Sequence, residues 1–121
     1  MTTFEIGKQL VELCRAGKNQ EAKEALYAAD IVSIEVAGNA AVPAETKGLP
    51  ATLAKGKAFV ENHTIHSVTL EGPFPNGDRF IVRLVYDVTH KPSSTRRTLD
   101  EAALYTVKNG KIVREEFFYT V

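Results

Sequence analysis

Two side chains in the first half of the chain have the chemistry of an acid–base site, Glu35 and His63. Glu35 lies in an alternating apolar run, residues 31–37, which is typical of a β-strand. A carboxylate in an apolar pocket suits a general base that abstracts a proton next to a carbonyl group, because burial moves such a group towards neutral pKa values. The alternative is that the strand simply alternates and leaves Glu35 on its solvent side.

His63 lies on the apolar stripe of a helix that is expected to begin at Pro50, so it is predicted to point at a sheet. A histidine titrates near neutral pH and could serve as an acid, a base or a hydrogen-bond donor. In such a place it is also commonly a satisfied structural group. His66 follows three residues later, but the helix is expected to end between the two and no third ligand follows at a matching interval, so no metal site is predicted.

Further candidates lie on the last hairpin of the chain. Asn109-Gly110 between two strand-like runs is a strong hairpin signal, because a type I′ turn needs positive φ at both central residues. With this turn, opposing residues keep a constant sum, so Leu104 is predicted to pair with Glu115. The face predicted to be concave then carries Asp100, Ala102, Leu104, Thr106, Val113, Glu115, Phe117 and Tyr119.

On that face Tyr119 could donate a hydrogen bond through its phenol, with Asp100 as its partner across the strands. Glu115 is expected either to line a pocket or to pair with a cation such as Arg83 inside the sheet. The other face is predicted to carry Glu101, Arg114 and Glu116 as polar members of an interface. Its apolar residues are expected to be buried against another surface, and a homodimer is the simplest way to provide one. The residues predicted to form it are Tyr105, Val107, Ile112 and Phe118.

Periodicity and turn residues predict the elements that would position these groups. The capping-box pattern of Thr2 with Glu5 begins a first helix, and Gly17 ends it. The stretch 38–48 has no period and is expected to be a rim or lid. Early helices followed by an antiparallel meander indicate an α+β fold with the helices on one face of a curved sheet. The expected helices are 3–16, 20–28 and one from Pro50 to about His63, and the expected strands are 31–37, 66–71, 79–90, 96–108 and 111–121.

Length and composition limit the class of protein. A chain of 121 residues is expected to form a single domain over 1–121. Fifteen basic and fifteen acidic residues give no net positive charge that would attract nucleic acid or an anionic membrane surface. The N-terminus lacks a basic start followed by an apolar run, so a cytoplasmic location is predicted. Without a glycine-rich phosphate loop, a nucleophile elbow or a metal signature, no cofactor is expected, and Cys14 is interpreted as a packing residue.

Three stretches resemble the nuclear transport factor 2-like superfamily, and within it the SnoaL-like group that includes polyketide cyclases. They are residues 24–30 (EALYAAD), Gly48 before the third helix, and residues 104–119 (LYTVKNGKIVREEFFY). The resemblance covers essentially the whole chain and implies a cystatin-like cone, with three helices packed on a curved, mostly antiparallel sheet. It also implies an apolar pocket between the helices and the concave side, and dimerisation through the outer side. It says little of function, because members of the superfamily have unrelated activities and some only bind.

Similarity to the ketosteroid isomerases of this superfamily implies roles at single positions. Glu35 falls where their general base lies, whereas Leu10 and Ala102 fall where their two oxyanion donors lie. The base position is therefore kept and the oxyanion hole is not. The residues implied to line the pocket are Leu10, Phe59, Ala102, Leu104, Glu115 and Phe117.

Two functions remain open at this point. The chain is either a cofactor-independent isomerase, cyclase or lyase that acts on an apolar carbonyl compound, or a domain without catalysis that binds a small apolar ligand or acts through its dimer surface. In the first case Glu35 is the base, and the donor is His63, Asp100 or Tyr119.

Overall fold

The computed structural model describes residues 1–38 and 43–120. Three helices come early in the chain and the long strands come late. In chain order the elements are α1 (Thr3–Arg15), α2 (Asn19–Leu26), β1 (Tyr27–Ile34), β2 (Glu45–Lys47), α3 (Leu49–Asn62), β3 (His63–Asn76), β4 (Arg79–His90), β5 (Thr95–Lys108) and β6 (Lys111–Phe118).

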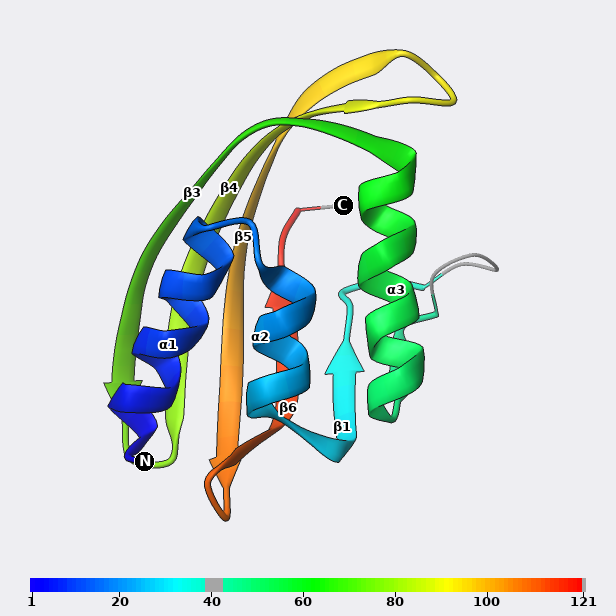
Figure 1. The fold of residues 1–121 in the computed structure, drawn as a ribbon. Coiled ribbons are helices and arrows are strands. Elements are labelled where there is room, and N and C mark those ends of the chain that lie inside the picture. Colours follow the sequence, from blue (N-terminus) through cyan, green and yellow to red (C-terminus); the bar gives the residue numbers. More distant parts are fainter. Residues whose placement is uncertain (39–42, 121) are drawn as a thin grey trace.

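The strands form one sheet in the order β2-β1-β6-β5-β4-β3. Its neighbouring strands are antiparallel except for β1 and β6, which run parallel. All three helices lie on one face of the curved sheet (Figure 1). The predicted α+β arrangement is therefore confirmed. In the part of the chain that the structure describes, no helix has the length and apolar character needed to cross a membrane.

Several element bounds differ from the predictions. β1 begins at Tyr27 directly after α2, where the helix was expected to continue to residue 28. β3 continues to Asn76, although a turn was expected from residue 73, because a register irregularity absorbs Gly72 and the following proline. The expected rim contains the short strand β2, while residues 39–42 of that rim and Val121 of the last expected strand lie outside the described residues.

Helix α1 packs closely on the sheet through one glycine. Its apolar stripe is buried, and Gly7 lies on the same face. A Cβ atom added at Gly7 would lie 2.8 Å from Cβ of Pro73 and 3.1 Å from Cδ2 of Phe80. Such distances are shorter than packed carbon atoms tolerate, so the glycine sets how near α1 can approach β3 and β4.

We expect Gly7→Ala to lower the free energy of unfolding by about 1–2 kcal/mol, because overpacking against the rigid ring of Pro73 outweighs the helix propensity gained from alanine. Urea unfolding measures the change, and Lys8→Ala on the exposed side of α1 is the control. An unchanged or higher stability of Gly7→Ala would mean that Pro73 moves aside without penalty.

The hairpin of β5 and β6 contains a β-bulge that the sequence analysis did not predict. The pairing next to the turn is as predicted, with Val107 opposite Ile112. Val113 is then an extra residue on β6, and beyond it Leu104 pairs with Glu116, one residue further along β6 than predicted. Because neighbouring residues of a strand point to opposite faces, this shift exchanges the two faces of β5 relative to β6.

The predicted dimer surface is therefore wrong in most of its members. Tyr105 and Ile112 are buried, Val107 packs against the same core, and all three lie on the helix side of the sheet. Phe118 does lie on the outer face, with 53% of its surface exposed.

Candidate functional site

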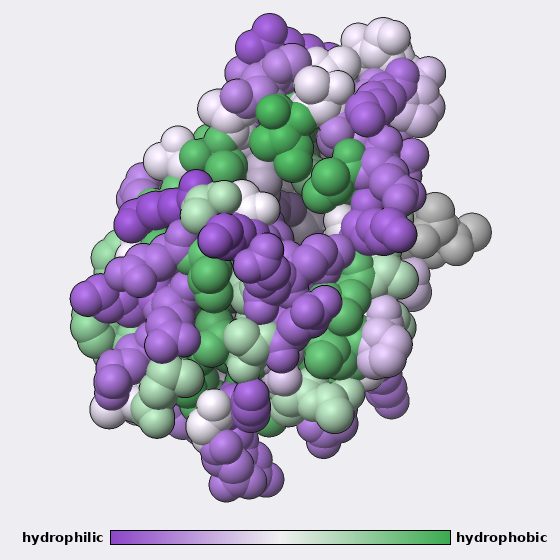
Figure 2. Space-filling view, in the orientation of Figure 1, coloured by the Kyte–Doolittle hydropathy of each residue, from purple (hydrophilic) through white to green (hydrophobic). Residues whose placement is uncertain are grey.

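A hollow opens between α3 and the sheet, above α2 in the view of Figure 2. Helix α3 turns Lys55 and Phe59 towards the sheet, four residues apart on one face of the helix, whereas His63, which was expected on this helix, is the first residue of β3. Lys55 Nζ lies 5.3 Å from the ring centroid of Phe117, and the ring centroid of Phe59 lies 5.8 Å from that of Tyr86. One stripe of α3 and the helix side of β4 and β6 therefore bound the same space.

Glu35 follows the last residue of β1, and its side chain is 14% exposed. Its Oε1 accepts a hydrogen bond from Lys55 Nζ at 2.7 Å, and its Oε2 accepts one from the Tyr119 hydroxyl at 2.8 Å. Burial and the bond to this carboxylate raise the pKa of Tyr119 to about 12, so the phenol keeps its proton. The structure thus brings together two of the predicted site residues and turns Glu35 away from bulk solvent.

A second carboxylate lies in the core next to this pair. Glu115 is 1% exposed, and its Oε1 accepts a hydrogen bond from the Tyr27 hydroxyl while Oε2 accepts one from Ser33 Oγ at 2.6 Å. Ser33 lies directly opposite Glu115 in the parallel pairing of β1 and β6. Ser33 Oγ also accepts a hydrogen bond from Lys55 Nζ at 2.7 Å. Hydrogen bonds therefore connect the core carboxylate through Ser33 and Lys55 to Glu35.

Glu101 joins the same space from β5, although the sequence analysis assigned it to the outer face. The bulge turns it to the helix side, in register with the buried Leu84 of β4. Burial, with the neighbouring Glu35 carboxylate, raises the pKa of Glu101 to about 7, while the charge of Lys55 opposes the shift. A carboxyl group that titrates near neutral pH in such a hollow is a candidate for proton transfer.

The raised pKa of Glu101 predicts a pH dependence of stability. Between about pH 4.5 and 7 the folded chain holds a proton that the unfolded chain releases, so stability falls as pH rises through this window. We expect Glu101→Gln to remove about 1–2 kcal/mol of that fall, less than the full shift because the side chain is partly exposed. Urea unfolding of both proteins at several pH values measures it.

The matched control for that measurement is Asp100→Asn, one residue away and on the opposite face. Asp100 is hydrogen-bonded to Arg83, which lowers its pKa, so its contribution to stability is lost as pH falls rather than as it rises. Parallel pH profiles for wild type and Glu101→Gln would contradict the burial of Glu101.

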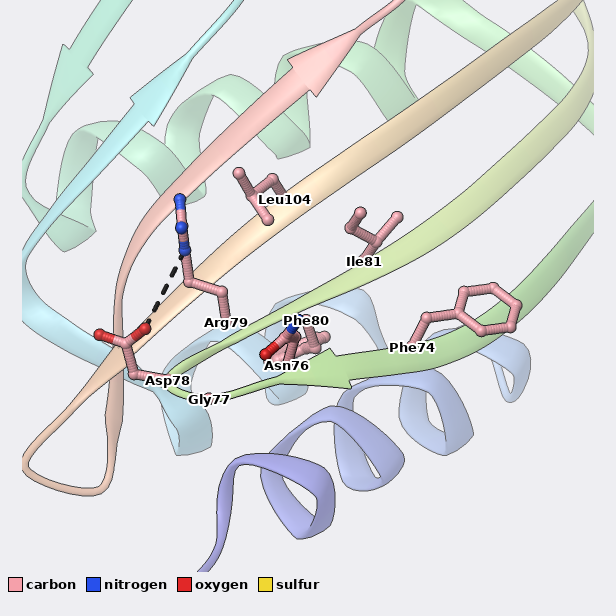
Figure 3. A pocket seen from close by; sticks show the side chains of 8 residues that line it. All are labelled: Phe74, Asn76, Gly77, Asp78, Arg79, Phe80, Ile81 and Leu104. Carbon is pink, nitrogen blue, oxygen red and sulfur yellow. Dashed lines mark ion pairs between the residues drawn. The ribbon is translucent and has the colours of Figure 1, made fainter.

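The predicted placement of Asp100, Ala102 and Leu104 on the concave face is wrong. Asp100 binds the Arg83 guanidinium through both carboxylate oxygens, at 3.1 and 2.8 Å, on the exposed side of the sheet. Leu104 lines an outer hollow of about 510 Å³ with Phe74 and Ile81 (Figure 3). The bulge at Val113 is the physical reason, since it shifts these three residues out of the face that Glu115 shares.

The two candidate histidines form their hydrogen bonds with groups other than the site carboxylates. His63 Nδ1 is 2.8 Å from the carbonyl oxygen of Phe59, so Nδ1 carries the proton, and its ring stacks on that of Phe59 at 4.2 Å. His63 Nε2 is buried without a partner among the described residues. His66 is exposed and bonds Thr89. Within residues 1–38 and 43–120, no three His, Cys, Asp or Glu side chains are placed to hold a metal ion.

The remaining residues that were predicted to line a pocket lie on the helix side of the sheet. Leu10 is 3% exposed in the core, and Phe117 is partly buried against it. Phe59 lies between His63 and Tyr86. The apolar pocket itself stays a prediction.

Sequence reasoning missed Lys55, Ser33 and Tyr27. Lys55 lies four residues before Phe59, which the resemblance implied to line the pocket, but the apolar stripe that was predicted to face the sheet did not include this lysine. Ser33 and Tyr27 depend on the pairing of β1 with β6, which joins residues far apart in the chain.

This geometry defines a cone-like α+β domain with an acid–base cluster between its helices and its sheet. The model of the SnoaL-like domain matches residues 1–119, and the chain belongs to this family. No protein with curated annotation matches the chain in sequence.

Solved structures agree with this assignment. A protein from Mesorhizobium loti, proposed as a SnoaL-like polyketide cyclase and also labelled carbohydrate phosphatase, is 44% identical, with a TM-score of 0.93 over 98% of this chain and 100% of its own. An NTF2-like protein from Burkholderia thailandensis is 20% identical, with a TM-score of 0.85 over 99% and 92% of the two chains. A protein from Xanthomonas campestris with a cystatin-like fold is 16% identical, with a TM-score of 0.80 over 100% and 92%. The last two share the fold.

Proposed function

We propose that this SnoaL-like domain is a cofactor-independent proton-transfer enzyme of isomerase, cyclase or lyase type, acting on an apolar carbonyl compound bound between α3 and the sheet. Glu35 is the general base and Glu101 the group that returns a proton. The observation that carries the proposal is the Glu35 carboxylate held between Lys55 and Tyr119, with a second carboxyl group, Glu101, whose pKa is raised to about 7, nearby.

Glu35 has the geometry of a positioned base. Each of its oxygens accepts one hydrogen bond, from Lys55 or from Tyr119, and a carboxylate oxygen has two lone pairs. A lone pair therefore remains on each oxygen for a substrate proton, and neither anchoring bond has to break. Two fixed donors also hold the carboxylate in one orientation, which general base catalysis requires.

Glu101 complements this base. With a pKa of about 7 it populates both protonation states near neutral pH, whereas Glu35 faces a cation. Pairs of carboxyl groups whose surroundings separate their proton affinities are the usual acid and base of such sites. In the proposed reaction a C–H bond next to the carbonyl breaks, its proton moves to Glu35, and its electron pair moves onto the carbonyl oxygen. Glu101 then donates its proton to another carbon as the carbonyl group re-forms, and the proton on Glu35 passes to Glu101 before the next turnover.

The surroundings favour an apolar substrate. Phe59, Phe117 and Tyr86 lie along the stripe of α3 and the facing strands, next to the polar cluster. The name of the Mesorhizobium loti relative, a proposed polyketide cyclase, supports a substrate with several carbonyl groups, since polyketides carry such groups. His63 and Asp100 have no part in this proposal, because one contacts Phe59 and the other lies on the outer face.

A screen of monocyclic and polycyclic ketones and lactones in deuterated water tests the proposal. We expect wild type to exchange protons next to the carbonyl group of at least one compound, and Glu35→Gln to lower that exchange rate about 100-fold or more, as removal of a general base does. Nuclear magnetic resonance follows the loss of the C–H signal. Glu45→Gln, an exposed carboxylate paired with Lys47, is the control and is expected to exchange like wild type.

Equal exchange by wild type and Glu35→Gln would remove Glu35 from the mechanism. Binding of the ketones without exchange would instead support the second candidate, a domain that binds small ligands without chemistry.

We also propose that the chain forms a homodimer through the outer face of the sheet. An apolar strip crosses this face, because Phe74 pairs with Ile81, Ile81 pairs with Leu104, and Phe118 lies diagonally beyond it. Phe74 and Ile81 are 57% and 44% exposed, and Figure 3 places both on the side away from the helices. Arg83 and Asp100 lie on the same face and pair with each other, so they neutralise each other's charge beside the apolar strip.

We expect Ile81→Glu to convert a dimer into a monomer, because it would bury an unpaired carboxylate at the centre of this strip. Light scattering after size-exclusion chromatography measures the mass. Val60→Glu changes an exposed apolar residue of α3 and is the control. A wild-type chain that is monomeric at high concentration would contradict the proposal.

A further inference from the structure

Lys55 occupies a position between the core carboxylate and the predicted base. Its side chain is 16% exposed, and its Nζ donates to Ser33 Oγ and to Glu35 Oε1, each at 2.7 Å. We propose that Lys55 holds the carbonyl oxygen of the substrate and stabilises the negative charge that develops there. This inference rests on the proposed function, and it gives Lys55 a second role besides its bond to Glu35.

The number of donors leaves room for a substrate oxygen. A lysine ammonium has three N–H groups, and two of them are used by Ser33 and Glu35. The structure gives the third no acceptor among the described residues. The ring of Phe117 lies close by, with its centroid 5.3 Å from Nζ. An apolar carbonyl compound against this ring could therefore present its oxygen to the ammonium.

The core below Lys55 fixes the direction of the ammonium. Ser33 has one hydroxyl proton, which it donates to Glu115, so its oxygen must act as an acceptor towards Lys55. Glu115 in turn is held by Tyr27 and is almost completely buried. Ser33 and Glu115 are thus positioning residues for Lys55, and a donor that is oriented in advance needs no reorganisation when charge develops.

The proposed reaction would preserve the charge around Lys55. Before proton transfer its counter-ion is the Glu35 carboxylate, 2.7 Å away. When Glu35 takes the proton from carbon it becomes neutral, and the electron pair of the broken C–H bond gives the substrate oxygen a negative charge. The counter-ion of Lys55 therefore changes from Glu35 to the enolate at the same step. In a partly buried site this exchange lowers the barrier, because the ammonium is never left without a partner.

A stable anion tests this role without any turnover. 4-Nitrophenolate carries its charge on an oxygen attached to an apolar ring, and its colour reports binding and ionisation. At a pH where the probe is ionised, we expect Lys55→Met to bind it about 10- to 100-fold more weakly than wild type, the range for a lost charge-assisted hydrogen bond. Lys57→Met, an exposed lysine of the same helix, is the matched control and is expected to bind like wild type.

Two further variants are expected to bind the anion more tightly than wild type or nearly as tightly, and loss of folding could not produce either result. Glu35→Gln removes the competing carboxylate, so we expect it to bind the anion more tightly than wild type, and Lys55→Arg is expected to retain much of the affinity. Circular dichroism confirms that each variant is folded. Anion affinity that is absent in wild type, or equal in wild type and Lys55→Met, would overturn the inference, as would unchanged or weaker binding by Glu35→Gln.

These outcomes are distinct from those of the proton-exchange screen. Exchange that depends on Glu35, with anion binding that does not depend on Lys55, would keep the proposed function and reject this role. Anion binding that depends on Lys55, without any exchange, would keep the oxygen-binding role and reject the enzyme.

Discussion

The burial of Glu115 is the constraint on which the polar part of this structure depends. A carboxyl group with 1% exposure needs hydrogen-bond donors, since an unsatisfied one would be strongly destabilising. Tyr27 and Ser33 supply them, and both come from β1, the strand that runs parallel to β6. The hydrogen bonds to Glu115 therefore link β1 to the C-terminal strand β6. They also fix the Ser33 hydroxyl, which accepts a hydrogen bond from Lys55.

The bulge at Val113 makes this arrangement compatible with the rest of the sheet. Without the extra residue, Glu115 would share a face with Leu104 and Asp100, and the core would lose Tyr105. With it, Glu101 and Glu115 both point to the helix side. The same residue therefore places Tyr105 in the core and turns Glu101 to the helix side of the sheet. Bulges that redirect side chains next to functional sites are a general feature of antiparallel sheets.

The fold could be predicted from the sequence because its signals are local. Apolar periodicity, the capping box of α1 and the Asn109-Gly110 turn each act over a few residues, and the structure agrees with all of them. Glu35 and Tyr119 do meet on the helix side, but each lies one residue beyond its strand, and Tyr119 bonds Glu35 and not Asp100, its predicted partner.

The errors in the facing of the β5 residues share one physical cause. A bulge has no strong sequence signal here, and a single extra residue reverses every facing beyond it, so Asp100 was placed inside and Glu101 outside. Lys55 was missed for a different reason. A lysine on a helix is normally solvated, and its inward direction depends on acceptors supplied by β1, which no local pattern in α3 reports.

Charge balance explains why two carboxyl groups can share this hollow. Lys55 neutralises Glu35 directly at 2.7 Å, and its second hydrogen bond goes to the neutral hydroxyl of Ser33. Its charge therefore stabilises the ionised form of Glu101 less than that of Glu35. Burial and repulsion by Glu35 then favour a proton on Glu101, which agrees with its pKa of about 7. A bound apolar molecule would displace water from both groups and strengthen each of these effects. A bound ligand would therefore shield the Glu35 base from water and keep Glu101 protonated. A proton transfer between two carbons requires this combination of a base and an acid.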